Sequence, residues 1–293
     1  MRLPFRRPFR PDDLFGHLVQ TGVPGVEEWR GGAYRRTLRL PGGPGIVALR
    51  PQEGHVAAEL RLTDVRDVGA AVARCRRLLD LDADPEAAEQ TLGADPVLAP
   101  LVVAFPGRRM PRTPDGSEMA LRVVLGQQVS TAAARTHAAR LVSALGTPVH
   151  DPVGGLTHLF PAAEAVAGVD QETLSFPRTR RRTLVMLAEA LAAGDLDLGV
   201  GADREHARSV LTSMPGIGPW TVDSIAMRAL GDPDVFLAGD LGIRQVAAGL
   251  GLPTTPARLT AHAHSWRPWR SYAVLHLWGT LDHPITRMPK DGS

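Results

Sequence analysis

The strongest constraint on the fold is a change of hydrophobic pattern across a segment rich in Pro and Gly, residues 106–116. Before it, runs such as Ala33–Leu40 and His55–Leu62 have the composition of strands, and their short connections favour antiparallel pairing. After it, apolar residues recur at helical spacing. The sequence therefore predicts an α+β N-terminal domain (an antiparallel sheet with helices) over 1–105, a linker over 106–116 and an all-α domain over 117–293.

The positions of individual strands and helices are predicted from the spacing of apolar residues, from helix-capping residues, and from Pro and Gly, which end helices and strands. Before the linker, strands are predicted at Ala33–Leu40, 46–50 and His55–Leu62, and helices at 12–21, at 64–79 and from Asp84, which precedes a proline. Beyond the linker, helices are predicted from Ser117 to 125, from Ser130 to 145, and then at 161–167, 179–193, 205–213, 219–230, 241–250, 256–265 and 269–281.

The composition excludes several classes of protein. The 293 residues contain no window of 18 consecutive apolar residues, so no membrane-spanning helix is expected, and the N-terminus lacks the apolar region of a secretory signal. Cys75 is the only cysteine, which rules out internal disulfides, a Cys-ligated zinc finger and an iron–sulfur cluster. A reducing, cytoplasmic location is expected.

Lysine is almost absent from this chain. Lys290, three residues from the C-terminus, is the only lysine, so Schiff-base chemistry has no candidate amine within the fold. The formal charge of +2 is small, and clusters of arginine therefore say more about a nucleic-acid partner than the total charge does. Each of these clusters contacts phosphates or is a solvated surface: Arg108, Arg109 and Arg112 in the linker, and Arg178, Arg180, Arg181 and Arg182 before a helix.

The pentapeptide 214–218 (MPGIG) separates two predicted helices. Gly216 and Gly218 allow a tight turn and leave backbone N–H groups free at the start of the second helix, a site that suits an anion. Ile217 fills the gap between the helices. This pattern is typical of a helix-hairpin-helix that holds a nucleic-acid phosphate without reading sequence. Taken alone, it fits an ordinary helical hairpin equally well.

Asp240 follows an apolar run, 235–239, and opens a predicted helix, which by itself indicates an ordinary N-cap. Its distance of 22 residues from Gly218 adds a second interpretation. With this spacing, the chain resembles the helix-hairpin-helix superfamily of DNA base-excision glycosylases, in its 3-methyladenine DNA glycosylase II branch. Further segments carry the resemblance: 76–81 (RRLLDL), 125–130 (LGQQVS), 215–221 (PGIGPWT) and 266–278 (WRPWRSYAVLHLW).

The resemblance implies a monofunctional glycosylase that flips alkylated purines of the 3-methyladenine and 7-methylguanine type out of the duplex and hydrolyses the N-glycosidic bond. Asp240 is the implied catalytic carboxylate, which stabilises the positive charge on the sugar. Trp220 and Trp278 are the implied stacking surfaces of the base pocket. Ser224, Leu241 and His17 stand at pocket positions where the family often has aromatic residues.

The remaining implied roles concern DNA, a metal ion and partners. Gln128, with Gln127 beside it, takes the place of the wedge that fills the gap left by the flipped base. Other implied DNA contacts are Gly216, Ile217, Gly218, Thr221 and Arg244. The carbonyls of Thr212, Met214 and Ile217 match a family site for Na⁺ or K⁺, and no other cofactor is expected. The implied partner is double-stranded DNA with damaged bases, bound by a monomer without a membrane and located with the bacterial nucleoid.

Bifunctional members of the superfamily carry a lysine just after the hairpin, where this chain has Trp220. The sequence therefore predicts release of the base without cleavage of the strand. Three alternatives stay open at this level: a glycosylase for deaminated or oxidised bases, a DNA-binding protein that uses the hairpin without catalysis, and a metal-dependent nuclease, for which no carboxylate cluster has suitable spacing.

Overall fold

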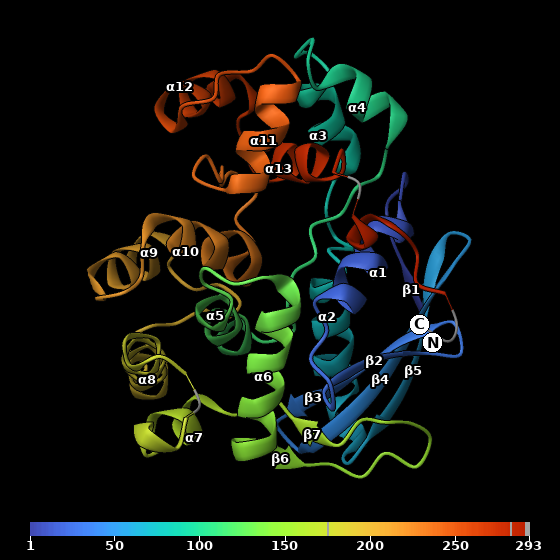
Figure 1. Cartoon of the computed structure of the whole chain (residues 1–293). Helices are drawn as coiled ribbons and strands as arrows, with labels where there is room; N and C mark the ends of the chain where they lie inside the picture. The colour runs from blue at the N-terminus through green and yellow to red at the C-terminus, as the bar shows by residue number, and fades with distance from the viewer. Residues whose placement is uncertain (175, 282, 291–293) are drawn as a thin grey trace.

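The N-terminal part of the computed structural model is built on a five-stranded antiparallel sheet (Figure 1). The structure describes residues 1–290 except 175 and 282. The strand order is β1-β5-β4-β3-β2. The strands are β1 (Arg2–Pro4), β2 (Glu27–Arg30), β3 (Ala33–Leu40), β4 (Gly43–Gln52) and β5 (His55–Leu62). The three predicted strands are confirmed, whereas β1 and β2 are edge strands of 3 and 4 residues, too short to show a period.

Two helices pack against this sheet, α1 (Pro11–Gln20) and α2 (Val68–Leu78), the latter after a short 3₁₀ turn at Val65–Asp67. Leu14 and Phe15 from α1 and Cys75 and Leu78 from α2 form one apolar core with inward residues of the strands, such as Val47. Burial of these side chains stabilises the packing of a helical layer, α1 and α2, on the sheet.

The rest of the chain is helical, as expected. Its helices are α5 (Gly116–Leu125), α6 (Thr131–Leu145), α7 (Ala163–Ala167), α8 (Arg178–Ala193), α9 (Arg204–Ser213), α10 (Pro219–Ile225), α11 (Leu241–Gly249), α12 (Pro256–His262) and α13 (Arg270–Trp278), with 3₁₀ turns at Gln171–Thr173, Ala263–Trp266 and Pro284–Thr286. The predicted fold class is therefore confirmed.

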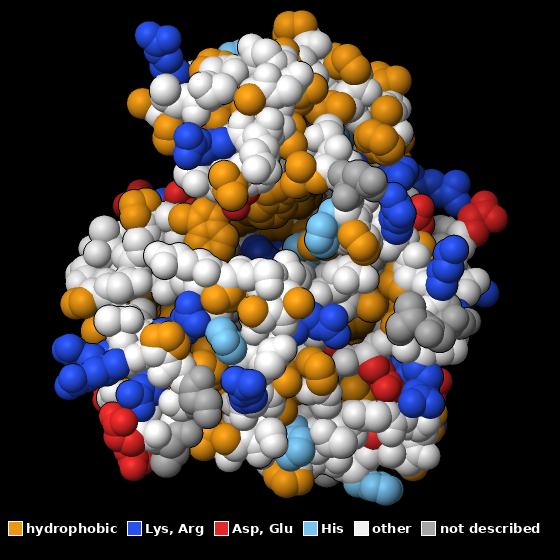
Figure 2. All heavy atoms as spheres, in the orientation of Figure 1, with side chains coloured by type: hydrophobic (Ala, Val, Ile, Leu, Met, Phe, Trp, Pro, Cys, Tyr) orange, Lys and Arg blue, Asp and Glu red, His pale blue; other side chains and the backbone are white. Residues whose placement is uncertain are grey.

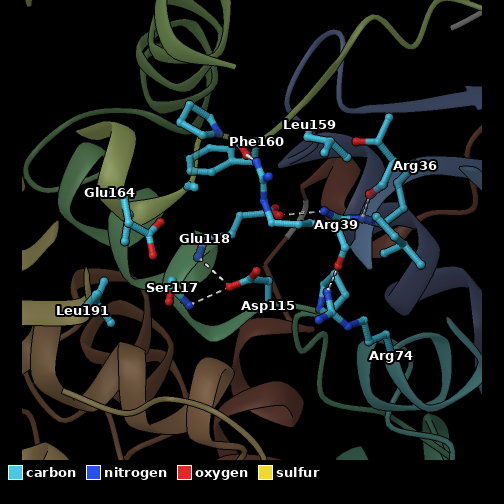
Figure 3. Close-up of a pocket in the computed structure, with 16 residues that line it drawn as sticks. Arg36, Arg39, Arg74, Asp115, Ser117, Glu118, Leu159, Phe160, Glu164 and Leu191 are labelled. Atoms are coloured by element: carbon cyan, nitrogen blue, oxygen red, sulfur yellow. Dashed lines mark hydrogen bonds and ion pairs between the residues drawn. The ribbon is translucent and has the colours of Figure 1, made fainter. Parts of the chain in front are cut away.

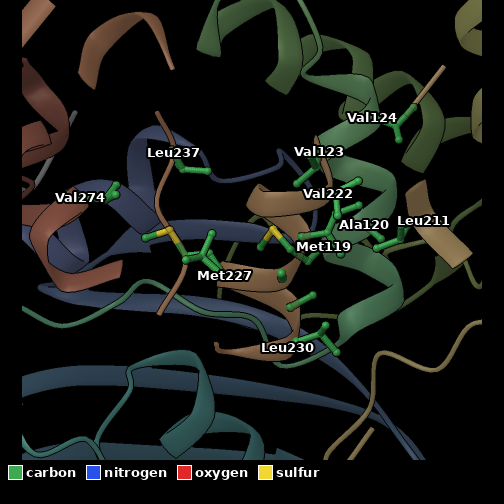
Figure 4. Close-up of a cluster of buried hydrophobic side chains, with 14 of the residues drawn as sticks. Met119, Ala120, Val123, Val124, Leu211, Val222, Met227, Leu230, Leu237 and Val274 are labelled. Atoms are coloured by element: carbon green, nitrogen blue, oxygen red, sulfur yellow. The ribbon is translucent and has the colours of Figure 1, made fainter. Parts of the chain in front are cut away.

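Helix α5 packs against α6, α8 and α10, and Figure 4 shows apolar side chains at this contact. Met119, Ala120 and Val123 on this helix pack against Val222 on α10 and against Leu211 on α9. Because α5 has neighbours on several sides, its residues are buried almost all round, and the helix fixes where α10 and the hairpin before it lie.

Four local expectations differ from the structure. Asp115 rather than Ser117 caps α5, because its carboxylate accepts the N–H groups of Ser117 and Glu118. Helix 219–230 changes to a π-helical turn at Ala226–Leu230, and the last helix ends at Trp278 instead of 281. A small two-stranded sheet, β6 (Thr147–Pro148) with β7 (His158–Leu159), lies within the helical part.

Helices α3 (Pro85–Leu92) and α4 (Ala99–Ala104) precede the predicted linker but lie beside α11 and α13, in the upper lobe of Figure 1. Asp95, between them, accepts hydrogen bonds from Trp266 Nε1 at 2.8 Å and from His262 Nε2 at 3.1 Å. One apolar core thus contains residues from both sides of segment 106–116. The boundaries proposed from the sequence, 1–105 and 117–293, stay a prediction.

Buried ion pairs join the sheet to α5. Arg36 on β3 contacts Glu118 at 2.7 Å and Glu27 at 3.3 Å, and Arg122 contacts the same two carboxylates at 2.9 and 3.0 Å. The two guanidiniums lower the pKa of Glu27 despite its burial. Each charge is therefore compensated, which buried charges require.

No helix among the described residues has both the length and the hydropathy that crossing a membrane demands.

Candidate active site

Asp240 is the N-cap of α11, and its carboxylate has three hydrogen-bond donors. Oδ1 accepts the backbone N–H of Ile243 at 3.0 Å and the indole N–H of Trp278 at 3.1 Å, and Oδ2 accepts the indole N–H of Trp220 at 3.0 Å. The structure thus brings together three residues that are 20 and 38 positions apart in the sequence. An ordinary cap needs only the backbone donor, so the two indole contacts exceed what capping of α11 requires.

A cavity of about 280 Å³ opens beside this carboxylate. Figure 2 shows the hollow between the upper lobe and the rest of the molecule, with hydrophobic side chains along its wall. Asp240 and Trp278 line the cavity. The other lining residues come from α1, the linker, the first turn of α11, the last turn of α13 and the C-terminal segment: Asp13, His17, Arg108, Arg109, Pro111, Gly242, Leu275, Gly279, Leu281, His283, Ile285 and Thr286.

Asp13, which lines this cavity, is paired with two arginines. Asp13 contacts Arg108 at 3.0 Å and Arg10 at 2.8 Å, and burial raises the pKa of Asp13. Burial also lowers the pKa of His17 well below its usual value, helped by the positive charges of Arg228 and Arg122, so its imidazole is neutral at physiological pH. The cavity therefore combines apolar surface with the carboxylate of Asp240 and the neutral imidazole of His17, next to the ion pair of Asp13 and Arg108.

Trp220, expected to stack on the base, does not line this cavity although its indole contacts Asp240. It lines a neighbouring cavity of about 640 Å³ and is 36% exposed. Of the other pocket residues expected from the sequence, Ser224 is buried and its hydroxyl has no hydrogen-bond partner, while Leu241 is 67% exposed next to Asp240. Neither lines the smaller cavity. Their roles in binding a base stay predictions.

The hairpin before α10 has the geometry that its glycines suggest. Gly216 has φ +86°, and a Cβ there would lie 2.1 Å from Thr183 Oγ1, so no other residue fits without rearrangement. Gly218 has an ordinary φ and open space at its Cβ position. Ile217 is buried and fills the turn, as expected. Among the described residues, no acceptor pairs with the N–H of Gly216 or Gly218, which leaves both amides available to an anion.

The two glutamines of segment 125–130 differ in position. Gln127 Nε2 donates to Gly216 O at 3.0 Å and to Thr221 Oγ1 at 2.9 Å, so this side chain ties the loop to the hairpin. Gln128 is exposed and has φ +55°, a conformation that is uncommon for a residue with a side chain. The strained, exposed position suits the residue predicted as the wedge. Thr221 is buried, and Arg244 is exposed.

The expectation of a solvated surface is wrong for Arg108 and Arg109. These side chains are 5% and 2% exposed. Arg109 donates to the carbonyls of Ala83, Arg6 and Pro8. The residues bind the N-terminal segment to the linker because a guanidinium can donate to several carbonyls at once.

Of the three carbonyls proposed for a monovalent ion, that of Thr212 belongs to the end of α9, and those of Met214 and Ile217 belong to the hairpin turn. Met214 O accepts the N–H of Ile217 at 3.1 Å, and a carbonyl with one donor keeps a second lone pair for an ion. Carbonyl oxygens without a charged ligand suit Na⁺ or K⁺ better than a divalent metal. No group of three or more His, Cys, Asp or Glu among the described residues is arranged to hold a metal.

One positioning contact was not singled out from the sequence. Asp80, at the end of α2, accepts Tyr272 Oη at 2.8 Å and the backbone N–H of Met110 at 3.2 Å. It therefore anchors α13, the helix that carries Trp278, to the N-terminal part. Asp80 lies within segment 76–81, which carried the resemblance, but its partner 192 residues away is set only by the fold.

A polar cavity of about 190 Å³ on the sheet side differs from the one beside Asp240 (Figure 3). Its polar groups bond to each other: Arg39 donates to Phe160 O, Arg74 to Arg39 O, and Arg36 to Glu118. Because these groups have partners, this cavity is a gap between packed elements rather than a second catalytic centre.

Comparisons with known proteins agree with this geometry. Residues 1–115 match the AlkA N-terminal domain family, and residues 121–271 match the HhH-GPD superfamily of base excision DNA repair proteins. The chain is 56% identical over 289 residues to the probable bifunctional transcriptional activator/DNA repair enzyme AlkA of Mycobacterium tuberculosis, covering 99% of this chain but 58% of that relative's length. It is 33% identical to DNA-3-methyladenine glycosylase 2 of Escherichia coli, covering 91% of this chain and 92% of the relative.

A solved structure shares the whole fold. The 3-methyladenine DNA glycosylase from Archaeoglobus fulgidus superposes with a TM-score of 0.81 at 24% identity, over 95% of this chain and 97% of that one. The fold, the hairpin and the extent of both family matches give one conclusion: the chain belongs to the HhH-GPD superfamily of base excision DNA repair proteins.

Proposed function

We propose that this chain is a monofunctional DNA glycosylase that excises alkylated purines in base excision repair. One observation carries the proposal: a carboxylate fixed by two indoles lies at the edge of a largely apolar cavity. The names of the relatives from M. tuberculosis and E. coli support the same activity.

Asp240 would act on the sugar rather than on the base. Cleavage of the N-glycosidic bond develops positive charge on the deoxyribose, and a preorganised carboxylate stabilises that charge without moving. The indole N–H groups of Trp220 and Trp278 hold both oxygens, so the negative charge is fixed before substrate arrives. The base leaves with the electrons of the N-glycosidic bond, and a water molecule positioned by the same carboxylate bonds to the anomeric carbon and loses one proton to solvent.

An alkylated purine fits this chemistry because it already carries positive charge. Such a base leaves without a strong general acid, and the cavity has no second carboxylate facing Asp240 except Asp13, which is paired with Arg108. The aromatic face of Trp278 at the cavity attracts a cationic ring. Deaminated or oxidised bases lack this charge and would need further assistance.

Double-stranded DNA is the proposed partner, held by backbone contacts. The free amides of Gly216 and Gly218 lie at the start of α10, where the helix dipole favours a phosphate. Gln128 fills the gap in the duplex after the base is flipped. Arg244 and a monovalent ion at the carbonyls of Thr212, Met214 and Ile217 belong to the same proposal. The same proposal places the protein in the cytoplasm, at the nucleoid, as a monomer. It includes no further cofactor.

Strand cleavage by an internal amine is not part of this function, because Trp220 occupies the position of the lysine in bifunctional enzymes and Lys290 is the only lysine. The test is mass spectrometry of bases released from methylated duplex DNA, with borohydride trapping in parallel. We expect free 3-methyladenine and 7-methylguanine, an intact strand and no trapped complex. Release of deaminated or oxidised bases alone, or no release, contradicts the proposal.

A further inference from the structure

His17 lines the cavity beside Asp240, and one of its ring nitrogens has no partner, whereas the neighbouring Asp13, Arg108 and Arg109 take part in ion pairs or hydrogen bonds. Its imidazole lies on α1, which belongs to the sheet layer, and it lines the cavity together with Asp240 and Trp278. Nε2 of His17 is buried and forms no hydrogen bond with any described residue. Asp240, in the same cavity, has three donors.

Other histidines of the chain have partners suited to a structural role. His262 Nε2 contacts Asp95 at 3.1 Å, and His137 Nδ1 contacts Leu125 O at 3.3 Å. His276 on α13 also has an unpaired ring nitrogen, but it does not line the cavity. An unpaired polar atom inside a protein is costly, and one at a cavity wall can regain a partner from a ligand.

The imidazole is suited to a base rather than to a phosphate. It is neutral, since burial and the nearby Arg228 and Arg122 disfavour its protonated form. A neutral imidazole has one donor and one acceptor, so it can pair with the edge of a purine without repelling a cationic ring. Rotation of the ring about its Cβ–Cγ bond exchanges the atoms that face the cavity, and the barrier to this torsion is low.

We propose that His17 is a specificity-determining residue that hydrogen-bonds to the edge of the excised purine. This inference rests on the proposed function of the same cavity. Purines that differ in their edge groups, such as 7-methylguanine with its C6 carbonyl and 3-methyladenine with its C6 amine, are then released at rates whose ratio His17 sets. Trp278 and Asp240 contribute to the release of every base, whereas His17 changes the release rate of one base relative to another.

The test measures that ratio within one sample of methylated duplex DNA, so loss of active enzyme cancels. In His17→Phe, which keeps an aromatic ring without nitrogen atoms, we expect the ratio of the kcat/KM values for the two bases to change about tenfold. In His17→Gln, whose side-chain amide restores a donor and an acceptor near Nε2, we expect a ratio within about twofold of the wild type.

Three outcomes distinguish a failure of the role of His17 from a failure of the proposed function. An unchanged ratio in His17→Phe overturns the role of His17. Equal changes of the ratio in His17→Phe and His17→Gln also overturn it, because ring packing alone would then explain both. A wild-type protein that releases neither base contradicts the proposed function itself, and DNA binding by the same sample shows that the protein was folded.

Discussion

The junction between the sheet and α5 differs from the cavity beside Asp240 in how its polar groups are satisfied. At the junction, Arg36 and Arg122 share two carboxylates and all four side chains are paired. At the cavity and the hairpin, His17 Nε2 and the amides of Gly216 and Gly218 have no partner among the described residues. Paired buried charges hold the fold, whereas unpaired polar atoms beside a cavity mark the place where a ligand completes the bonding.

The largest effect is expected at Asp240. Asp240→Asn keeps the size and the helix cap but removes the charge, and base release should fall about a thousandfold with DNA affinity retained. Single-turnover release and an equilibrium binding assay measure the two quantities. Asp203→Asn is the matched control, since Asp203 caps α9 through Glu205 and His206 N–H without an indole. Equal loss in both variants would mean that Asp240 is only a cap.

Removing a charge from the junction should affect stability instead of catalysis. Arg36→Met leaves Glu27 and Glu118 with one guanidinium between them, and we expect the free energy of unfolding to fall by about 3–5 kcal/mol. Urea denaturation measures this change. Arg61→Met, which removes an exposed pair with Glu59, should cost less than about 1 kcal/mol. Similar losses in the two variants would remove the distinction between the regions.

Two tryptophans allow the same comparison within one side-chain type. Trp278 donates to Asp240 at the cavity, and the fully buried Trp266 donates to Asp95 in the core. Trp278→Phe should lower kcat about tenfold with little change in Tm, because a hydrogen bond to the catalytic charge is lost. Trp266→Phe should lower Tm with kcat unchanged. A lower Tm with unchanged kcat in Trp278→Phe would show that the indole at the cavity has a structural role.

The smallest effect concerns acid stability at the sheet. Arg35 holds Asp151 by a bidentate pair at 2.8 and 2.9 Å and lowers the pKa of Asp151 to about 2. The folded pKa lies below the unfolded value of about 3.9, so the pair stabilises the fold above pH ~4 and this contribution disappears as the pH falls towards 2. Asp151→Asn should reduce stability by about 1 kcal/mol at pH 6, and by progressively less below pH 4. A constant difference across this range would contradict the pairing.

Local signals predicted most of the elements. The period of 131–145 with Ser130 as its cap, and the tight turn at Gly216, depend on neighbours within a few residues, and the structure confirms them. Strands β1 and β2 were missed because edges of 3 and 4 residues acquire their conformation from the strand beside them. The cap of α5 was placed at Ser117 because Asp115 and Ser117 are equally good caps by residue type.

The candidate site was predicted in part. Resemblance singled out Asp240, Trp220 and Trp278, and the structure places them together, but their assigned roles await the experiments above. That both indoles donate to the carboxylate depends on side-chain directions from three separate helices. The burial of Arg108 and Arg109 could not be predicted from the sequence either. An arginine in a segment rich in Pro and Gly has the same local sequence pattern in solvent and in a core.

By itself, the sequence determined the helices, the antiparallel sheet, the tight hairpin and the absence of an internal lysine, since these follow from spacing, caps and residue chemistry. Only the tertiary structure decided that α3 and α4 join the lobe of α11 and α13, that His17 but neither Ser224 nor Leu241 lines the cavity of Asp240, and which buried charges are paired. These contacts join residues far apart along the chain, and their free energy depends on packing in three dimensions that no local pattern encodes.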